Sequence, residues 1–123
     1  MKLCDFGFSK LGLTLCPDDK PLRTVCGSPQ YMAPEINGRE AYAGPPVDMW
    51  ALGALVYEML HATPAFRASS LAQLSMRILK ASHGALGKET PPQARALIKR
   101  LLVVEPKARL SADELTRHAW LLG

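Results

Sequence analysis

The fold of this chain is decided by one stretch of its sequence, Val47-Asp48-Met49-Trp50-Ala51-Leu52-Gly53-Ala54-Leu55-Val56-Tyr57-Glu58-Met59-Leu60. Apolar residues occupy nearly every side of a helix drawn through it, and the apolar run from Met49 to Leu60 is interrupted only by Glu58. A helix that is apolar all round is buried in a core, whereas a membrane span needs about 20 apolar residues. We therefore expect residues 47–60 to form the fully buried central helix of a mainly α protein, and we expect no membrane partner.

Three further helices are predicted after the central one. Each begins with a Ser or Thr that is followed three residues later by Gln or Glu, at residues 70–73, 90–93 and 111–114, and this capping-box pattern is typical of a helix start. Apolar residues then recur at helical spacing. The expected core faces are Leu71, Leu74, Ile78 and Leu79 in the first helix, Ala94, Leu97, Ile98, Leu101 and Leu102 in the second, and Ala112, Leu115, Ala119 and Leu122 in the third. We expect these helices to pack around the central one.

The region before the central helix has a different character. Residues 5–46 contain eleven Gly and Pro residues without sustained periodicity, which predicts a long loop with short turns. The residues before Asp5 are expected to be the end of a strand. Long loops inside compact domains are often functional.

Composition limits the class of protein. The chain has 123 residues, 48% of them apolar and 21% charged, which fits one ordinary globular domain. The net charge is +4, and residues 67–109 hold nine basic residues against Glu89 and Glu105. We interpret this excess as a solvated basic helical surface, with an anionic partner as the alternative, and we do not expect nucleic-acid binding.

Cysteine and histidine give no sign of a metal or disulfide framework. Cys4, Cys16 and Cys26 are odd in number and form no C-x-x-C pair, which favours a reducing compartment. We expect the cytoplasm, with the nucleus as the alternative, and a packed thiol at Cys26. The histidines, His61, His83 and His118, are scattered and are expected to be structural.

Three short motifs carry the chemistry. Asp5-Phe6-Gly7 is followed by Ala33-Pro34-Glu35 and then by the D-x-W-x-x-G pattern of residues 48–53. In this order and spacing they resemble the C-terminal lobe of eukaryotic protein kinases, and in detail the calcium/calmodulin-dependent group of Ser/Thr kinases. Later landmarks of that lobe are matched by Pro64-Ala65-Phe66, Arg109 and His118-Ala119-Trp120.

The resemblance implies a partial protein kinase domain over residues 1–123. Residues 1–35 would be the activation segment, and residues 36–123 a helical subdomain of about four main helices. The chain holds no Gly-rich phosphate loop, no strand lysine with its helix glutamate and no His-Arg-Asp loop. The resemblance therefore implies that the N-terminal lobe and the catalytic base lie outside this sequence.

The resemblance also assigns cofactor contacts. Asp5 would bind Mg²⁺, and Asp5, Phe6 and Gly7 would together form the part of the ATP–Mg²⁺ site that this chain supplies. Phe6 would pack into the core, and Gly7 would permit the backbone turn after Asp5.

On the substrate side, Gly27, Ser28, Pro29 and Tyr31 would form the docking loop for a protein substrate. Ser28 would contact the catalytic Asp and help to seat a Ser or Thr acceptor, so it is counted with Asp5 among the catalytic residues. Glu58 would bind a basic residue near the acceptor, because an Arg–carboxylate fork is directional. Thr24 stands where many Ser/Thr kinases carry an activation-loop phosphate.

Four further residues have structural roles in the resemblance. Glu35 and Arg109 would form a buried pair that ties the docking loop to the last helices. Asp48 would be a buried, poorly satisfied carboxylate here, because the loop that it braces in the family is absent from this sequence. Trp50 is expected in the core.

Two functional classes remain open. One is part of a Ser/Thr protein kinase that is inactive as this isolated chain, with the missing half as a partner. The other is a non-catalytic, truncated kinase-like protein that binds substrates or another protein. In both, one face of the central helix should be exposed, which predicts marginal stability and self-association. A small basic helical module is a weaker alternative that explains none of the three motifs.

Overall fold

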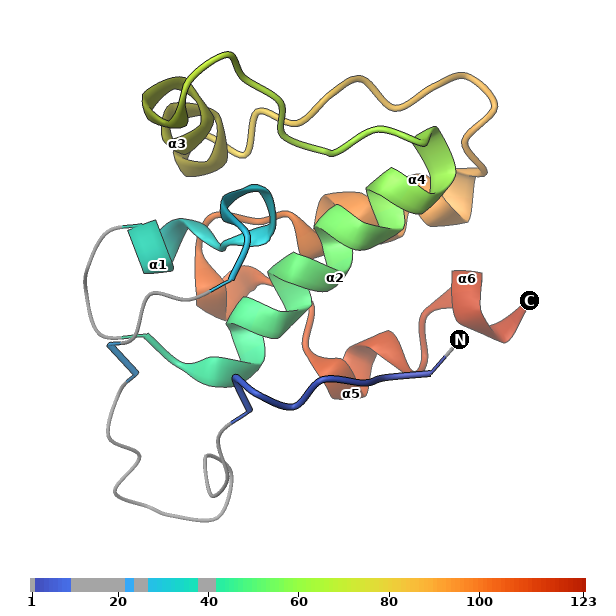
Figure 1. The fold of residues 1–123 in the computed structure, drawn as a ribbon. Coiled ribbons are helices and arrows are strands. Elements are labelled where there is room, and N and C mark those ends of the chain that lie inside the picture. Colours follow the sequence, from blue (N-terminus) through green and yellow to red (C-terminus); the bar gives the residue numbers. More distant parts are fainter. Residues whose placement is uncertain (1, 10–21, 24–26, 38–41) are drawn as a thin grey trace.

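The protein is built from helices and connecting loops. The structure, a computed structural model, describes residues 2–9, 22–23, 27–37 and 42–123. It contains two short 3₁₀ helices, six α-helices and, among the described residues, one isolated antiparallel bridge between Leu22 and Tyr42. The elements, shown in Figure 1, are η1 (Pro29–Tyr31), α1 (Pro34–Asn37), α2 (Gly44–His61), α3 (Leu71–Leu79), α4 (Pro92–Leu101), η2 (Pro106–Ala108), α5 (Ala112–Leu115) and α6 (Ala119–Leu122). The mainly α prediction is confirmed, whereas the strand predicted before Asp5 is wrong, because residues 2–6 form no ladder with any described residue.

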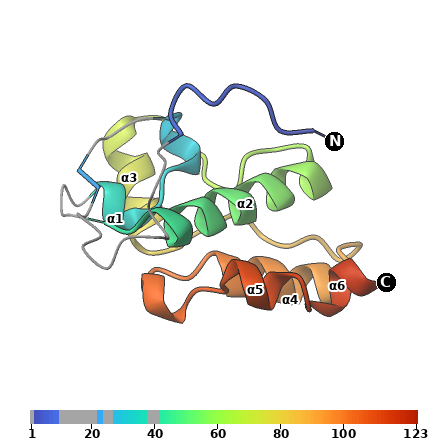
Figure 2. The ribbon, with the colours of Figure 1, turned by 90° about the horizontal axis from the view of Figure 1, so that it is seen from below.

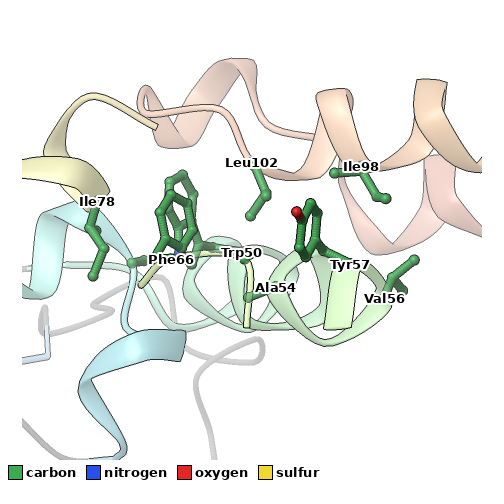
Figure 3. Close-up of a cluster of buried hydrophobic side chains, with 10 residues drawn as sticks. Trp50, Ala54, Val56, Tyr57, Phe66, Ile78, Ile98 and Leu102 are labelled. Atoms are coloured by element: carbon green, nitrogen blue, oxygen red, sulfur yellow. The ribbon is translucent and has the colours of Figure 1, made fainter. Parts of the chain in front are cut away.

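The central helix is α2, as expected, but it is longer than the apolar run. It starts at Gly44, with Pro in its first turn, where the missing N–H leaves no hydrogen bond unmade. One side is buried against the rest of the chain and includes Trp50, Ala54 and Tyr57 (Figure 3). The other side is open, since Leu55 is 38% and Met59 is 63% exposed. The fully buried helix expected from the apolar pattern is therefore wrong for this face, which no described segment covers, whereas the exposed face expected from the kinase resemblance is confirmed.

The helix α4 lies along α2 and closes the core. Its predicted apolar residues are all buried, Leu97, Ile98 and Leu101 among them. The two helices approach closely at Gly53, where a Cβ would lie 2.7 Å from Cβ of Leu101, so only glycine fits there. Figure 2 shows α4, α5 and α6 forming a layer beside α2.

The helix α3 contributes less to the core than its sequence predicts. It packs mainly against α1 and η1. Ile78 is fully buried and Leu74 partly so, whereas Leu71 and Leu79 are 70% and 45% exposed. The helix α3 lies beside α1 (Figure 1), and only one side of its apolar face is covered.

The helix starts follow the predicted caps in two of three cases. Ser70 accepts a hydrogen bond from the Gln73 backbone, and Ser111 forms a complete capping box with Glu114. The prediction at Thr90 is wrong, because α4 begins after Pro91 and the Thr90 hydroxyl contacts His61 instead. A buried hydroxyl with a side-chain partner is no longer available to a helix end.

The last predicted helix is divided in two. The helix α5 ends at Leu115, and His118, in an extended conformation, caps α6 by accepting the Trp120 N–H. Leu122 is consequently 71% exposed rather than part of a core face. Within the described part of the chain, we find no helix that is both long and apolar enough to span a membrane.

Candidate functional site

The segment from Gly27 to Asn37 lies against the first turns of α2 and borders a cavity. Gly27 has a φ of +104°, a conformation that favours glycine, and Ser28 follows it as an exposed, extended residue. The cavity is about 480 Å³ and brings Gly27, Ser28 and Tyr31 together with Phe8, Ser9 and Asp48. Three of the predicted substrate residues therefore share one cavity with the D-x-W-x-x-G helix.

The first anchor of this segment is a hydrogen bond from Tyr31 to Glu58. The Tyr31 hydroxyl donates to Oε2 of Glu58 over 2.6 Å. This bond, followed by burial of the ring, raises the pKa of Tyr31 above its ordinary value. The bond fixes the Glu58 carboxylate beside the docking segment, 27 positions away in the sequence.

The second anchor is the ion pair between Glu35 and Arg109. Nη1 and Nη2 of Arg109 donate to the two carboxylate oxygens of Glu35 over 2.8 and 3.0 Å. The Arg109 side chain is 0% and the Glu35 side chain 15% exposed. Arg109 also donates to the backbone carbonyls of Pro46, Val103 and Val104. A bidentate buried pair of this kind is directional, and removal of one partner leaves the other charge uncompensated.

Trp50 lies beneath the second anchor. It is fully buried, as predicted for a core residue. Cζ of Arg109 is 5.2 Å from the centre of its ring, and the ring stacks on Phe66 at 5.4 Å. The guanidinium thus contacts an aromatic face as well as a carboxylate, so the pair and the core support each other.

Asp48 differs from its prediction. It is an exposed residue at the cavity rim rather than a buried carboxylate. Partial burial of the carboxyl by the cavity wall still raises its pKa. The cavity is open to solvent, which spares Asp48 the cost of full desolvation.

The Asp5-Phe6-Gly7 motif forms a local turn at the surface. The Gly7 N–H donates to Oδ1 of Asp5 over 3.2 Å, and Ser9 donates through its N–H and its hydroxyl to the Phe6 carbonyl. Asp5, not Gly7, has the positive φ, at 60°. Asp tolerates this conformation when its side chain bonds the nearby backbone. A Cβ at Gly7 would lie 3.2 Å from Oδ1 of Asp5, so glycine leaves room for the carboxylate in this turn.

Phe6 does not pack into the core of this chain. It is 69% exposed, since residues 2–8 run along the surface without a covering segment among those described (Figure 2). Asp5 and Gly7 are also exposed, and none of the three lines the cavity. In the described part of the chain, no three His, Cys, Asp or Glu residues gather as metal ligands.

Some of the predicted site residues lie elsewhere. Thr24 and Cys26 lie outside the described residues, and Pro29 begins η1 without lining the cavity. The motifs missed the apolar part of the cavity wall, which includes Met32, Ile36 and Val47. Their spacing around Ala33-Pro34-Glu35 and at the start of α2 is the only signal that could have found them.

Comparison with known proteins completes the description of this site. The family model described as protein kinase domain matches residues 1–121. The chain is 40% identical over 124 residues to the serine/threonine-protein kinase H1 homolog of Pinctada fucata, covering 98% of this chain and 29% of that protein. It is 38% identical over 120 residues to the serine/threonine protein kinase OSK3 of Oryza sativa subsp. indica (98% of this chain, 23% of that protein). It is also 38% identical over 122 residues to NUAK family SNF1-like kinase 1 of Mus musculus (98% and 18%). The chain thus spans less than a third of each of these relatives.

Proposed function

This chain belongs to the protein kinase family, and from that premise we propose that it serves in a Ser/Thr kinase that transfers the ATP γ-phosphate to protein hydroxyls. Residues 1–35 act as the activation segment, and residues 36–123 as the helical subdomain that supports it. The observation that carries this proposal is the double anchoring of the segment around Ser28, through Tyr31 to Glu58 and through Glu35 to Arg109.

The substrate side of the site rests on Ser28 and Glu58. Ser28 is exposed at the cavity that Asp48 also borders, so its hydroxyl is available to help seat an acceptor residue. Glu58 offers a carboxylate whose orientation is fixed by the Tyr31 hydroxyl. A fixed carboxylate suits a bidentate Arg, which supports a protein substrate with a basic residue near its acceptor.

The cofactor side of the site rests on Asp5, which fits one ligand position for Mg²⁺. It is exposed, and its Oδ1 accepts only a weakly held local N–H at 3.2 Å. Mg²⁺ is ordinarily held by one or two carboxylates together with substrate phosphates, so a lone Asp is a sufficient contribution from this chain. When bound, Mg²⁺ would offset the charge of the ATP phosphates. Phe6 and Gly7 set the turn that presents Asp5.

The remaining parts of the kinase come from outside this sequence. The chain has no Gly-rich phosphate loop and no His-Arg-Asp loop, so the catalytic base and most of the ATP contacts belong to another segment or another protein. The isolated chain is therefore inactive in this proposal. Thr24 is the proposed phosphosite, and the cytoplasm the proposed location.

The test compares phosphate transfer by the native protein and by the isolated chain. An antibody against residues 67–109 would isolate the protein from its source cells, and labelled ATP with a mixture of basic peptides would report transfer. We expect activity in the native protein that falls at least about 100-fold in Asp5→Asn, and none in the 123-residue chain. Asp113→Asn, an exposed carboxylate of α5, is the matched control. Activity that survives Asp5→Asn would exclude the role proposed for Asp5.

A second candidate function is supported by the open face of α2. Leu55 and Met59 are exposed there, and exposed apolar side chains on one helix face are typical of binding surfaces. In this alternative the chain is a non-catalytic module that binds a protein substrate or another kinase. A native protein near 13.4 kDa that transfers no phosphate would favour this alternative.

A further inference from the structure

A histidine at the end of α2 ties down the connection between α3 and α4. Nδ1 of His61 lies 2.8 Å from the carbonyl oxygen of Tyr57, one turn back in the same helix. Nε2 lies 3.2 Å from the backbone nitrogen of Gly87 and 3.0 Å from the Thr90 hydroxyl. One imidazole thus joins the helix end to two points of the segment 84–90.

The backbone partners determine where the proton of this imidazole lies. A carbonyl oxygen can only accept, so Nδ1 must carry a hydrogen to bond Tyr57. The Gly87 N–H can only donate, so Nε2 must present its lone pair. The Thr90 hydroxyl is free to rotate and can donate to the same nitrogen. Both fixed contacts are satisfied only by neutral imidazole with its hydrogen on Nδ1.

A second proton would break this arrangement on one side only. The bond from Nδ1 to Tyr57 survives, because that nitrogen is a donor in either state. A hydrogen on Nε2 would face the Gly87 N–H, and the two donors cannot bond. His61 stands in the last turn of α2, where the helix dipole favours a positive charge.

The charged and titratable groups around His61 act in different directions. Arg95 of α4 donates to the carbonyls of Leu86, Gly87 and Thr90 and places a fixed positive charge on the same segment. Tyr57 stacks on the imidazole at 4.2 Å, and burial raises the pKa of its hydroxyl. His83 lies 5.8 Å from the Tyr57 ring. Lys88 and Glu89 are exposed neighbours of Gly87 with opposite charges.

We propose that His61 is a proton-operated latch, which in its neutral Nδ1–H form accepts the Gly87 N–H and releases that amide on protonation. Histidine gains a proton as the pH falls, so the latch is closed at alkaline pH and opens on acidification. The Thr90 hydroxyl can turn to accept from the protonated Nε2, while Arg95 and the bond from the Tyr57 hydroxyl to the Ala85 carbonyl hold the rest of the segment, so the opening is local to Gly87.

The first test reads the tautomer directly and needs no variant. Long-range ¹⁵N–¹H spectra of ¹⁵N-histidine-labelled protein containing this chain would be recorded at about pH 7.5, with His61 identified by the signal missing from His61→Gln. We expect the hydrogen on Nδ1, whereas free histidine in water favours Nε2. A hydrogen on Nε2 of His61 would overturn the proposal.

The second test measures exchange of the Gly87 amide hydrogen, corrected for its intrinsic pH dependence. Between about pH 7.5 and about pH 5.5 we expect its protection to fall about five- to tenfold, the worth of one hydrogen bond. His61→Gln, which does not titrate, should show no such fall. His83→Gln is the control, since His83 bonds only the Gly84 carbonyl nearby, and it should respond to pH as the unmodified protein does. Equal protection at both pH values in the unmodified protein, or an unchanged pH response in His61→Gln, would rule out the latch.

Discussion

At the scale of single residues, Arg109 joins several parts of the fold through its hydrogen bonds. Its guanidinium is buried and holds Glu35, three backbone carbonyls and the face of Trp50. We expect Glu35→Ala to lower the free energy of unfolding by about 3–5 kcal/mol, because the arginine is left buried and unpaired. Urea unfolding followed by circular dichroism measures this loss.

The matched control for Glu35→Ala is the exposed pair between Arg100 and Glu114. Both side chains are 52% exposed at a distance of 2.8 Å, and solvent weakens such pairs. Arg100→Ala should therefore change the free energy of unfolding by less than about 1 kcal/mol. Equal losses in the two variants would show that burial does not distinguish the pairs.

At the scale of one element, the end of α2 contains a strained residue. Ala62 has a φ of 53° and a ψ of 22°, a left-handed conformation that costs a residue with a Cβ about 1–2 kcal/mol. Ala62→Gly should raise the free energy of unfolding by about 0.5–1 kcal/mol, since glycine is freer in the unfolded chain as well. Urea midpoints provide the measurement.

The same substitution inside a helix should have the opposite sign. Ala96 is an exposed residue within α4, and Ala96→Gly should cost about 1 kcal/mol. If both variants are destabilised alike, the left-handed conformation of Ala62 does not exist in solution.

The helix α5 supplies a prediction about pH. Glu114 accepts hydrogen bonds from the N–H and the hydroxyl of Ser111 and from Arg100, and these bonds, the Ser111 N–H first, lower the pKa of its carboxyl. A depressed folded-state pKa means that the cap stabilises the fold above the unfolded value of about 4.3 and is lost as the pH falls through the folded value. Ser111→Ala removes the hydroxyl but keeps the backbone N–H, so it should move the Glu114 pKa part of the way back up, which a carboxyl ¹³C titration would detect. An unchanged pKa in Ser111→Ala would contradict the cap.

Helical periodicity predicted the buried face of a helix correctly where that helix packs against a neighbour along its whole length. The face of α4 was predicted in full, because the helix lies lengthwise on α2 and all of its apolar positions are buried. The split between α5 and α6 was not, since a run of apolar residues at helical spacing does not reveal that His118 will cap a new helix. At Thr90 the local pattern was overridden by a partner from α2, 29 positions away.

At the scale of the whole molecule, the open side of α2 governs behaviour in solution. Leu55 and Met59 are exposed there, and Phe6 and Phe8 are 69% and 78% exposed. Apolar side chains in this number favour association. We expect the isolated chain to self-associate at micromolar concentration, and the double variant Leu55→Lys with Met59→Lys to shift it toward the monomer in sedimentation velocity experiments.

The control for this double variant is Leu71→Lys, which changes a leucine on α3 that is 70% exposed, more than Leu55 or Met59. It should leave the association unchanged. A monodisperse monomer of the unmodified chain would contradict the prediction. An equal effect of Leu71→Lys would show that the surface through which the chain associates is not the open side of α2.

Contacts between distant parts of the molecule explain why the sequence alone did not predict the surroundings of some site residues. The pairing of Glu35 with Arg109 came from family resemblance, as no local pattern links residues 74 positions apart. The environments expected for Phe6 and Asp48 were wrong, since both depend on what covers them, and no segment among those described does so. Motifs identify residue types and order, while burial is a property of the surrounding chain.

The separation of Glu35 and Arg109 also bears on the order in which the molecule folds. Their ion pair closes a loop that contains α2, α3 and α4, so we expect it to form late, after these helices have docked. An interaction made after the transition state slows unfolding and leaves the folding rate nearly unchanged. In stopped-flow experiments, Glu35→Ala should therefore accelerate unfolding by roughly 100-fold or more with little effect on refolding. A pair that forms late would determine how long the folded state lasts, not how quickly it is reached.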